Sequence, residues 1–341
     1  MGLHPSPPSS STPSPSTRAT GRVCVLGSLN MDLIVQTPRL PTPGETLLGG
    51  EFLTLPGGKG ANQAVAAARA GGSVSLIGAV GDDDYGRRMV GVVRSEGVDT
   101  SGIRRRGAGS SPTGIAVITV ATEQGENTIV VAGGANQTLT PAEIEDSPTT
   151  VRSAAVLLMQ LESPVDAVLA AAQIAKHGEA GTTTILNAAP AQRLPTTLLE
   201  RIDYLLVNRS EAAALTERLE SSEPAELANA TLDLGPRTVV LTLGSRGAMA
   251  LARTGNSVIT WYAPAFRVEP IDTVAAGDAF AGTLAAVLAA GRKGSLGEAL
   301  TLASAAGALA TTKRGAIPSL PSLAEINRLV MGQPECAARQ E

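Results

Sequence analysis

Aromatic residues are scarce in this 341-residue chain: one Trp, three Tyr and three Phe make up 2% of the sequence. Proteins that bind single-stranded nucleic acid stack the bases on aromatic side chains, and this inventory is too small for such a platform. The net charge of −4 also lacks the positive excess of a nucleic-acid binder. We therefore expect no nucleic-acid partner, and any anionic ligand must be bound by local chemistry.

Cysteine and histidine are equally rare. Two cysteines, Cys24 and Cys336, are too few for a disulfide framework or a four-thiolate metal site, and they indicate a reducing compartment. His4 lies in a Pro/Ser-rich stretch and His177 ends a predicted helix, so a Ser-His-Asp triad would depend on His177 alone. We expect proton transfer in this protein to use carboxylates, lysine or backbone dipoles instead.

Long apolar runs are absent as well, and none reaches the ~18 residues of a membrane helix, so we expect no membrane partner. The first twenty residues contain five Pro, six Ser and three Thr, and no acidic residue precedes Asp32. This composition predicts a disordered tail over residues 1–21, because it cannot bury enough surface to become ordered. An organellar transit peptide is the alternative for this Ser-rich, acid-free segment; otherwise we expect a cytoplasmic protein.

From residue 22 onward, short apolar runs alternate with windows of helical character. The apolar runs lie at 23–27, 74–78, 155–159, 185–187, 204–207 and 238–242. The helical windows lie at 59–70, 85–95, 164–177, 210–219 and 277–290. This alternation predicts an α/β fold in which a mostly parallel central sheet lies between two layers of helices, a three-layer α/β/α arrangement.

Two segments interrupt the alternation. Residues 33–56 and 113–131 contain β-type runs with no helical window between the runs of each segment. We expect them to form a small β-sheet that projects over the site as a lid. Neither an internal repeat nor a long linker divides the chain, so we expect one domain over 22–330 and a C-terminal tail over 331–341.

Glycine-rich segments after strands are the first places to look for a ligand site, because open parallel sheets bind ligands at the carboxyl ends of their strands. A Walker A loop needs G-x-x-x-x-G-K and then Ser or Thr, but Gly60 follows Lys59 and Leu53 stands at the first glycine position. The first apolar run continues into Gly27-Ser28-Leu29-Asn30 rather than the G-x-G-x-x-G of dinucleotide folds. Neither standard nucleotide motif is present.

Two other glycine-rich segments remain. Residues 271–280 place small residues and Asp278 at the start of an Ala-rich helix, where unpaired N–H groups and the helix dipole can bind an anion. Asp278 could equally be a carboxylate that only stabilises its helix. Residues 55–64 combine backbone, Lys59 and two amides at another helix start, for which a tight turn that caps the helix is the structural alternative.

These segments resemble the two signatures of the ribokinase-like (PfkB-type) sugar kinases. The resemblance extends from Arg22 to about Leu329 and includes six motifs in the expected order. They are Gly27-Ser28-Leu29-Asn30-Met31-Asp32, Gly57-Gly58-Lys59-Gly60-Ala61-Asn62-Gln63-Ala64, Met159-Gln160-Leu161-Glu162, Asn208-Arg209-Ser210-Glu211, Leu241-Thr242-Leu243-Gly244-Ser245-Arg246-Gly247 and Asp272-Thr273-Val274-Ala275-Ala276-Gly277-Asp278. The family resemblance implies the fold expected above, with a sheet lid.

The resemblance implies roles for individual residues at the sugar end. Asn30 and Asp32 would bind the sugar hydroxyls, with Glu162 reaching in from a strand end. The remaining sugar contacts would come from Gly58, Lys59, Gly60, Ala61 and Asn62. Asp278 would be the catalytic base and would also contact the substrate, while the N–H groups of Ala275, Ala276 and Gly277 would face the transferring phosphoryl group.

The resemblance also implies ATP, Mg²⁺ and K⁺ as cofactors. Asn208 and Glu211 would organise Mg²⁺ through water and phosphate. The residues bordering ATP would be Thr242, Gly244, Ser245, Arg246, Gly247, Gly277 and Ser304, although Ser304 departs from the His or Asn that relatives often carry there. The K⁺ loop would comprise Asp272, Val274, Ala310, Lys313, Gly315 and Ser319, mostly through backbone oxygens. Alternatively, Lys313-Arg314-Gly315 only ends a helix, where basic residues suit the dipole.

The implied reaction is ATP-dependent phosphorylation of D-ribose at its 5-hydroxyl, which yields ribose 5-phosphate and ADP. One alternative is another sugar or nucleoside kinase of the same family, although Phe52 is the only aromatic residue in the predicted lid segment 33–56 to stack on a base. A second alternative is a non-catalytic sugar- or nucleotide-binding module, which would be expected to lose Asp278 or Gly277. By analogy with relatives, we expect a homodimer formed through the lid sheets.

Overall fold

The computed structural model of this chain describes residues 21–340 except 108, 124–125, 147, 178–180 and 292–295. The tail predicted over 1–21 therefore lies, apart from Gly21, outside the described residues. Within the described part, no helix is long and apolar enough to cross a membrane.

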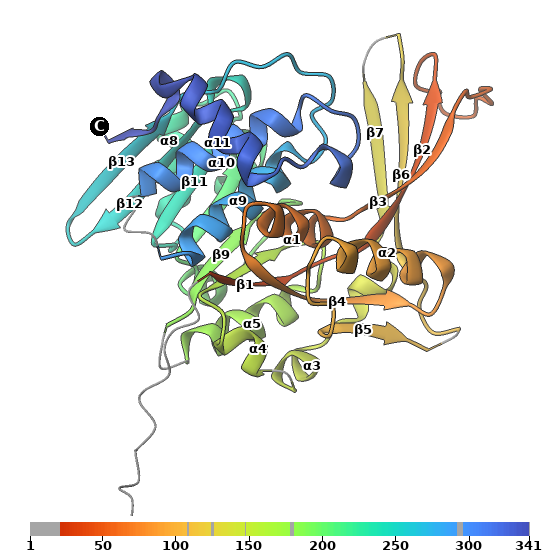
Figure 1. The fold of residues 1–341 in the computed structure, drawn as a ribbon, viewed down its shortest axis with the longest axis horizontal. Helices are drawn as coiled ribbons and strands as arrows, with labels where there is room; N and C mark the ends of the chain where they lie inside the picture. The colour runs from red at the N-terminus through yellow and green to blue at the C-terminus, as the bar shows by residue number, and fades with distance from the viewer. Residues whose placement is uncertain are drawn as a thin grey trace, which may run out of the picture.

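A ten-stranded sheet runs through the body, in the order β14-β13-β12-β11-β10-β9-β8-β1-β4-β5 (Figure 1). Its strands are β1 Arg22–Leu26, β4 Ser73–Gly81, β5 Ile103–Arg106, β8 Val156–Gln160, β9 Thr183–Asn187, β10 Tyr204–Asn208, β11 Thr238–Thr242, β12 Ala248–Thr254, β13 Ser257–Ala263 and β14 Arg339–Gln340. Pairing is parallel from β5 to β11 and antiparallel from β11 to β14. The predicted mostly parallel sheet is confirmed.

Helices cover both faces of this sheet. One layer contains α1 Lys59–Arg69, α2 Asp84–Ser95, α9 Ala276–Ala289, α10 Leu296–Ala310 and α11 Leu323–Gly332; the other contains α3 Pro141–Glu145, α4 Pro148–Arg152, α5 Val165–Lys176, α6 Thr196–Leu199, α7 Arg209–Thr216 and α8 Pro224–Leu232. Strand β8 shows why two layers are needed, since Val156 and Leu158 pack into the first core and Leu157 and Met159 into the second. Short 3₁₀ turns span η1 Gly134–Thr138, η2 Gly244–Arg246, η3 Ile317–Ser319 and η4 Pro334–Cys336.

A second, four-stranded sheet stands beside the body (Figure 1), in the order β3-β2-β6-β7. Its strands are β2 Asn30–Thr37, β3 Phe52–Gly57, β6 Gly114–Ala121 and β7 Asn127–Ala132. Strands β2 and β6 pair in parallel, and the outer pairs are antiparallel. The small separate sheet thus comes from the two segments that interrupted the α/β alternation.

The end of the chain is packed on the body. Helix α11 continues to Gly332, Cys336 is 4% exposed in the core cluster that contains Phe266, and β14 pairs with β13. Over the described residues, segment 331–340 is therefore not a free tail as the sequence suggested, because its apolar cysteine is buried and its backbone adds a strand to the sheet edge.

Candidate active site

The residues predicted to bind a sugar converge where strands of both sheets begin or end. Asn30 and Asp32 open β2 and are 2% and 8% exposed, Lys59 opens α1, and Glu162 follows β8 by two residues. This position at the carboxyl ends of β1 and β8 is the usual ligand site of an open parallel sheet.

Glycine at positions 58 and 60 lets these segments touch. Gly58 has φ +90°, and a Cβ there would lie 2.6 Å from the backbone nitrogen of Asn30. A Cβ at Gly60 would lie 2.4 Å from the carbonyl carbon of Gly27. The sequence predicted that backbone approaches a ligand closely at these glycines. In the structure, the segment that lies too close for a side chain is the β1–β2 connection of the same chain.

The Glu162 carboxylate is oriented by donors from both segments. Its Oε2 accepts from the Ser28 hydroxyl at 2.5 Å, the Lys59 backbone nitrogen at 3.2 Å and the Asn30 amide at 3.4 Å. The Gly60 N–H in turn donates to the Ser28 hydroxyl at 3.3 Å. Ala61 is fully buried and its N–H donates to the Ser28 carbonyl, so it supports this loop from behind.

Asn136 orients Asn30 and was not singled out in the sequence. Its Nδ2 donates to Asn30 Oδ1 at 2.7 Å and to the Leu29 carbonyl at 3.1 Å, while its Oδ1 accepts from the Leu29 N–H at 2.9 Å. These bonds turn the Asn30 amide nitrogen toward Glu162. The available signal was an Asn two residues after the Gly133-Gly134 pair that follows a strand.

The Asp278 carboxylate, 7% exposed in the first turn of α9, is bound on both oxygens. Asn62 Nδ2 donates to Oδ2 at 2.9 Å and Gln63 Nε2 to Oδ1 at 2.9 Å. The sugar signature and the phosphate signature, more than two hundred residues apart in the chain, are therefore one hydrogen-bonded unit.

The start of α9 has room for an anion. Ala275, the residue before the helix, has φ +61°, and no side chain among the described residues caps this helix. A Cβ built at Gly277 would meet nothing within 4 Å. The Ala276 N–H donates to the Thr273 carbonyl at 3.3 Å, while the open space beside Gly277 at the positive end of the helix dipole suits a phosphoryl group.

Several charges share this site. Burial, together with the Glu162 and Asp278 carboxylates, raises the pKa of Asp32 to about 7. Burial by itself would lower the pKa of the Lys59 ammonium, but the carboxylates of Asp278, Glu162, Glu211 and Asp32 raise it above its ordinary value. Lys59 therefore remains a cation in the middle of four acidic groups.

The residues predicted to organise Mg²⁺ and ATP lie along the adjacent strand ends. Asn208 and Glu211 form a capping box at the start of α7, and burial is the largest cause of the raised pKa of Glu211. Thr242 ends β11, Gly244, Ser245 and Arg246 form the η2 turn, and Gly247 follows it. Ser304 is buried on α10, and its hydroxyl has no partner in the described part of the chain. Gly307, one turn further along α10, lies against the Ala276 carbonyl.

Three residues of the predicted cation loop are joined by hydrogen bonds. Asp272 accepts from the Val274 N–H at 3.0 Å and from the Gly315 N–H at 2.9 Å. Ala310 ends α10, and Ser319, which is fully buried, donates to the Ala316 carbonyl. The Lys313 side chain pairs with Glu325 on α11, so only its backbone oxygen could serve a cation. No group of three His, Cys, Asp or Glu side chains suited to a metal occurs within the described ranges.

The sequence pattern of the pfkB family carbohydrate kinases matches residues 20–323, which includes every segment of this site. The chain belongs to this family. It is 41% identical to a ribokinase of Haemophilus influenzae, over 88% of this chain and 95% of that protein, and 38% identical to a ribokinase of Schizosaccharomyces pombe, over 89% and 96%. Its fold matches the Arabidopsis thaliana ribokinase complexed with ribose and ATP, with a TM-score of 0.82 and 31% identity over 91% of this chain and 99% of that one.

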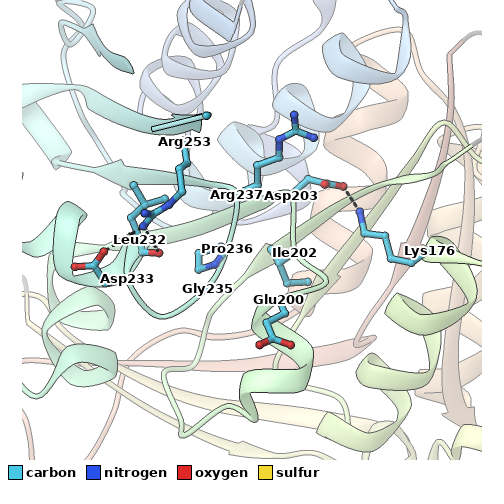
Figure 2. A pocket seen from close by; sticks show the side chains of 11 residues that line it. Lys176, Glu200, Ile202, Asp203, Leu232, Asp233, Gly235, Pro236, Arg237 and Arg253 are labelled. Carbon is cyan, nitrogen blue, oxygen red and sulfur yellow. Dashed lines mark hydrogen bonds and ion pairs between the residues drawn. The ribbon is translucent and has the colours of Figure 1, made fainter. Parts of the chain in front are cut away.

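A depression of about 670 Å³ lies elsewhere on this pfkB kinase (Figure 2). Asp203 and Arg237, which line it, immediately precede β10 and β11, so it opens at the amino ends of the strands, at the sheet edge opposite the site. Lys176 pairs with Asp203 at 2.5 Å and Arg253 with Asp233 at 3.1 Å. These four lining charges are therefore paired with one another.

Proposed function

We propose that this pfkB kinase transfers the γ-phosphoryl group of ATP to the 5-hydroxyl of D-ribose, with ribose 5-phosphate and ADP as products. Ribokinases are among its relatives over nearly the full chain, and a matching structure holds ribose and ATP. The observation that carries the proposal is the hydrogen bond of Asn62 to Asp278, because it brings the sugar signature to the helix start that suits a phosphoryl group.

Sugar binding is assigned to Asn30, Asp32, Lys59, Asn62 and Glu162, with Gly58, Gly60 and Ala61 shaping the loop. A polyol needs both donors and acceptors once it is buried, and this set provides amides, an ammonium and carboxylates. The Oδ1 atom of Asn62 is buried without a partner among the described residues, while its Nδ2 is committed to Asp278. A sugar hydroxyl would satisfy this orphaned acceptor.

Phosphoryl transfer requires mainly in-line positioning and stabilisation of negative charge. In the proposed mechanism, Asp278 accepts the proton of the 5-hydroxyl as that oxygen attacks the γ-phosphorus. The N–H groups of Ala275, Ala276 and Gly277 stabilise the charge on the transferring group, and the Lys59 ammonium adds a positive charge nearby. The segment from Thr242 to Gly247 and Ser304 would border the nucleotide.

Two cations complete the proposal, and the donor chemistry fits both. Mg²⁺ prefers oxygen ligands, and the half-buried Glu211 carboxylate in the first turn of α7 offers them together with Asn208 at the end of β10; the ion would neutralise phosphate charge. For K⁺, the oxygens would come from Asp272, Val274, Ala310, Lys313, Gly315 and Ser319. The Asp272 bonds to Val274 and Gly315 already hold two parts of this loop together beside α9.

The four-stranded sheet is assigned as a lid that excludes water when sugar binds, and as the contact surface of a homodimer. Its edge strand β7 is exposed throughout, and Val130, 68% exposed, pairs with Val117 on β6, 44% exposed, so that both side chains lie on one face of the sheet. Such an apolar patch favours association with a second copy. Val130→Glu should then halve the mass measured by light scattering; an unchanged monomeric mass in both proteins would contradict the dimer.

The proposed location of the protein is the cytoplasm.

The substrate assignment is tested by measuring ADP release with ribose, adenosine and fructose 6-phosphate as acceptors, and by identifying the phosphorylated carbon of the product by ³¹P NMR. We expect ribose to give the highest turnover, with phosphate on the 5-oxygen. A kinase for which ribose releases no more ADP than buffer, while another acceptor does, would refute the substrate. A protein that binds ribose and ATP but releases no ADP with any acceptor would be the non-catalytic module.

A further inference from the structure

Gln63 lies directly behind Asp278 and has no exposed surface. Its amide nitrogen donates to Asp278 Oδ1 at 2.9 Å and to Asn187 Oδ1, at the end of β9, at 3.0 Å. Its amide oxygen accepts from Gln160 Nε2, at the end of β8, at 2.6 Å. Gln63 therefore joins helix α1, helix α9 and two neighbouring strand ends without facing the sugar.

The direction of this amide chain is dictated by its last member. A carboxylate only accepts hydrogen bonds, so the Gln63 nitrogen must face Asp278 and its oxygen must face Gln160. Gln160 must then donate, and its own Oε1 is left buried without a partner among the described residues. This series of hydrogen-bonded amides therefore leaves one polar atom unsatisfied at Gln160, while both Asp278 oxygens are bonded.

We propose that Gln63 is a positioning residue that fixes the plane of the Asp278 carboxylate for proton transfer. This inference rests on the proposed function, in which Asp278 is the base. Rotation of a carboxylate about its last torsion has only broad minima, so Asn62 on Oδ2 alone leaves the plane free to turn. A second donor on Oδ1 holds the plane, and each oxygen keeps a lone pair, one of which can face the sugar hydroxyl.

The test is a double-mutant cycle on the full chain, with Gln63→Met and Asp278→Ala. Gln63→Met keeps the volume but removes both donors, and we expect kcat to fall about 10- to 100-fold, since small misplacements of a catalytic group cost that much. The KM for ribose should change less than about threefold, because Gln63 does not face the sugar. In the Asp278→Ala background, the same substitution should change kcat by less than about threefold, because no carboxylate remains to be positioned.

Gln160→Met is the matched control, because Gln160 is the same residue type, equally buried and bonded to Gln63 but not to Asp278. It should lower Tm as Gln63→Met does, yet leave kcat within about threefold of the wild type. If Gln63→Met does not fold, Gln63→Leu, which is also apolar and similar in size and has no donor, replaces it in the cycle.

Equal losses of kcat in both Asp278 backgrounds, or an equal loss from Gln160→Met, would overturn the positioning role in favour of simple packing. A wild-type protein inactive on ribose would instead refute the proposed substrate. The cycle is run with whichever sugar the wild type phosphorylates, so the two failures are distinguishable.

Discussion

Replacing Asp278 by Asn keeps the size of the side chain but removes the proton acceptor that the proposed mechanism requires. General-base catalysis contributes about 10²- to 10⁴-fold, so kcat should fall by that factor. Asn62 and Gln63 both donate to Asp278, so the new amide nitrogen needs an acceptor, and the Asn62 amide can supply one by turning over to present its Oδ1, which has no partner among the described residues. We therefore expect the variant to fold, with a loss of about 0.3–1 kcal/mol from the missing first-turn charge of α9.

The assay measures kcat, ATP affinity and the free energy of unfolding on the same purified variant. ATP should bind as tightly as before or slightly more tightly, because one negative charge beside its phosphates is removed. Asp84→Asn is the matched control, since Asp84 is the first-turn carboxylate of α2 and its side chain is 96% exposed. A merely stabilising role for Asp278 predicts near-normal turnover, and retention of even a third of the wild-type kcat would remove it from catalysis.

Three further outcomes are expected. Burial raises the pKa of Asp32 to about 7. If sugar binding requires the ionised form, as proposed, the KM for ribose should rise about tenfold per unit as pH falls below that value; Asp32→Asn should flatten this profile, and a flat wild-type profile would refute the argument. K⁺ should activate the enzyme more than Na⁺ at equal ionic strength. Equal initial rates in the two salts would refute the proposed K⁺ site. Deleting residues 1–20 should leave activity and Tm nearly unchanged; a Tm lower by more than a few degrees would show that this segment is docked.

The fold class could be predicted from the sequence because each strand and helix is indicated by a pattern of only a few neighbouring residues. Apolar runs such as 155–159 alternate with helical windows such as 164–177, and each run needs only its own buried or amphipathic face to be recognised. The structure places β8 and α5 within a residue or two of these ranges. The segment around Cys336 was misjudged because a two-residue strand has no periodicity of its own, and only its pairing with β13 gives it structure.

The sequence by itself determined which residue types carry the chemistry: the glycines at 57–60, the amides that follow them, and the acid at 278, all of which resemble a family signature. Tertiary structure decided which of them touch. Gly282 lets α9 approach α1 closely, since a Cβ there would lie 2.5 Å from the Gln63 carbonyl oxygen, and this approach brings Asp278 to Asn62 and Gln63. The pKa of Asp32 and the support from Asn136 likewise depend on groups far away in the chain. Burial and long-range contacts are properties of packing, and no local sequence window contains them.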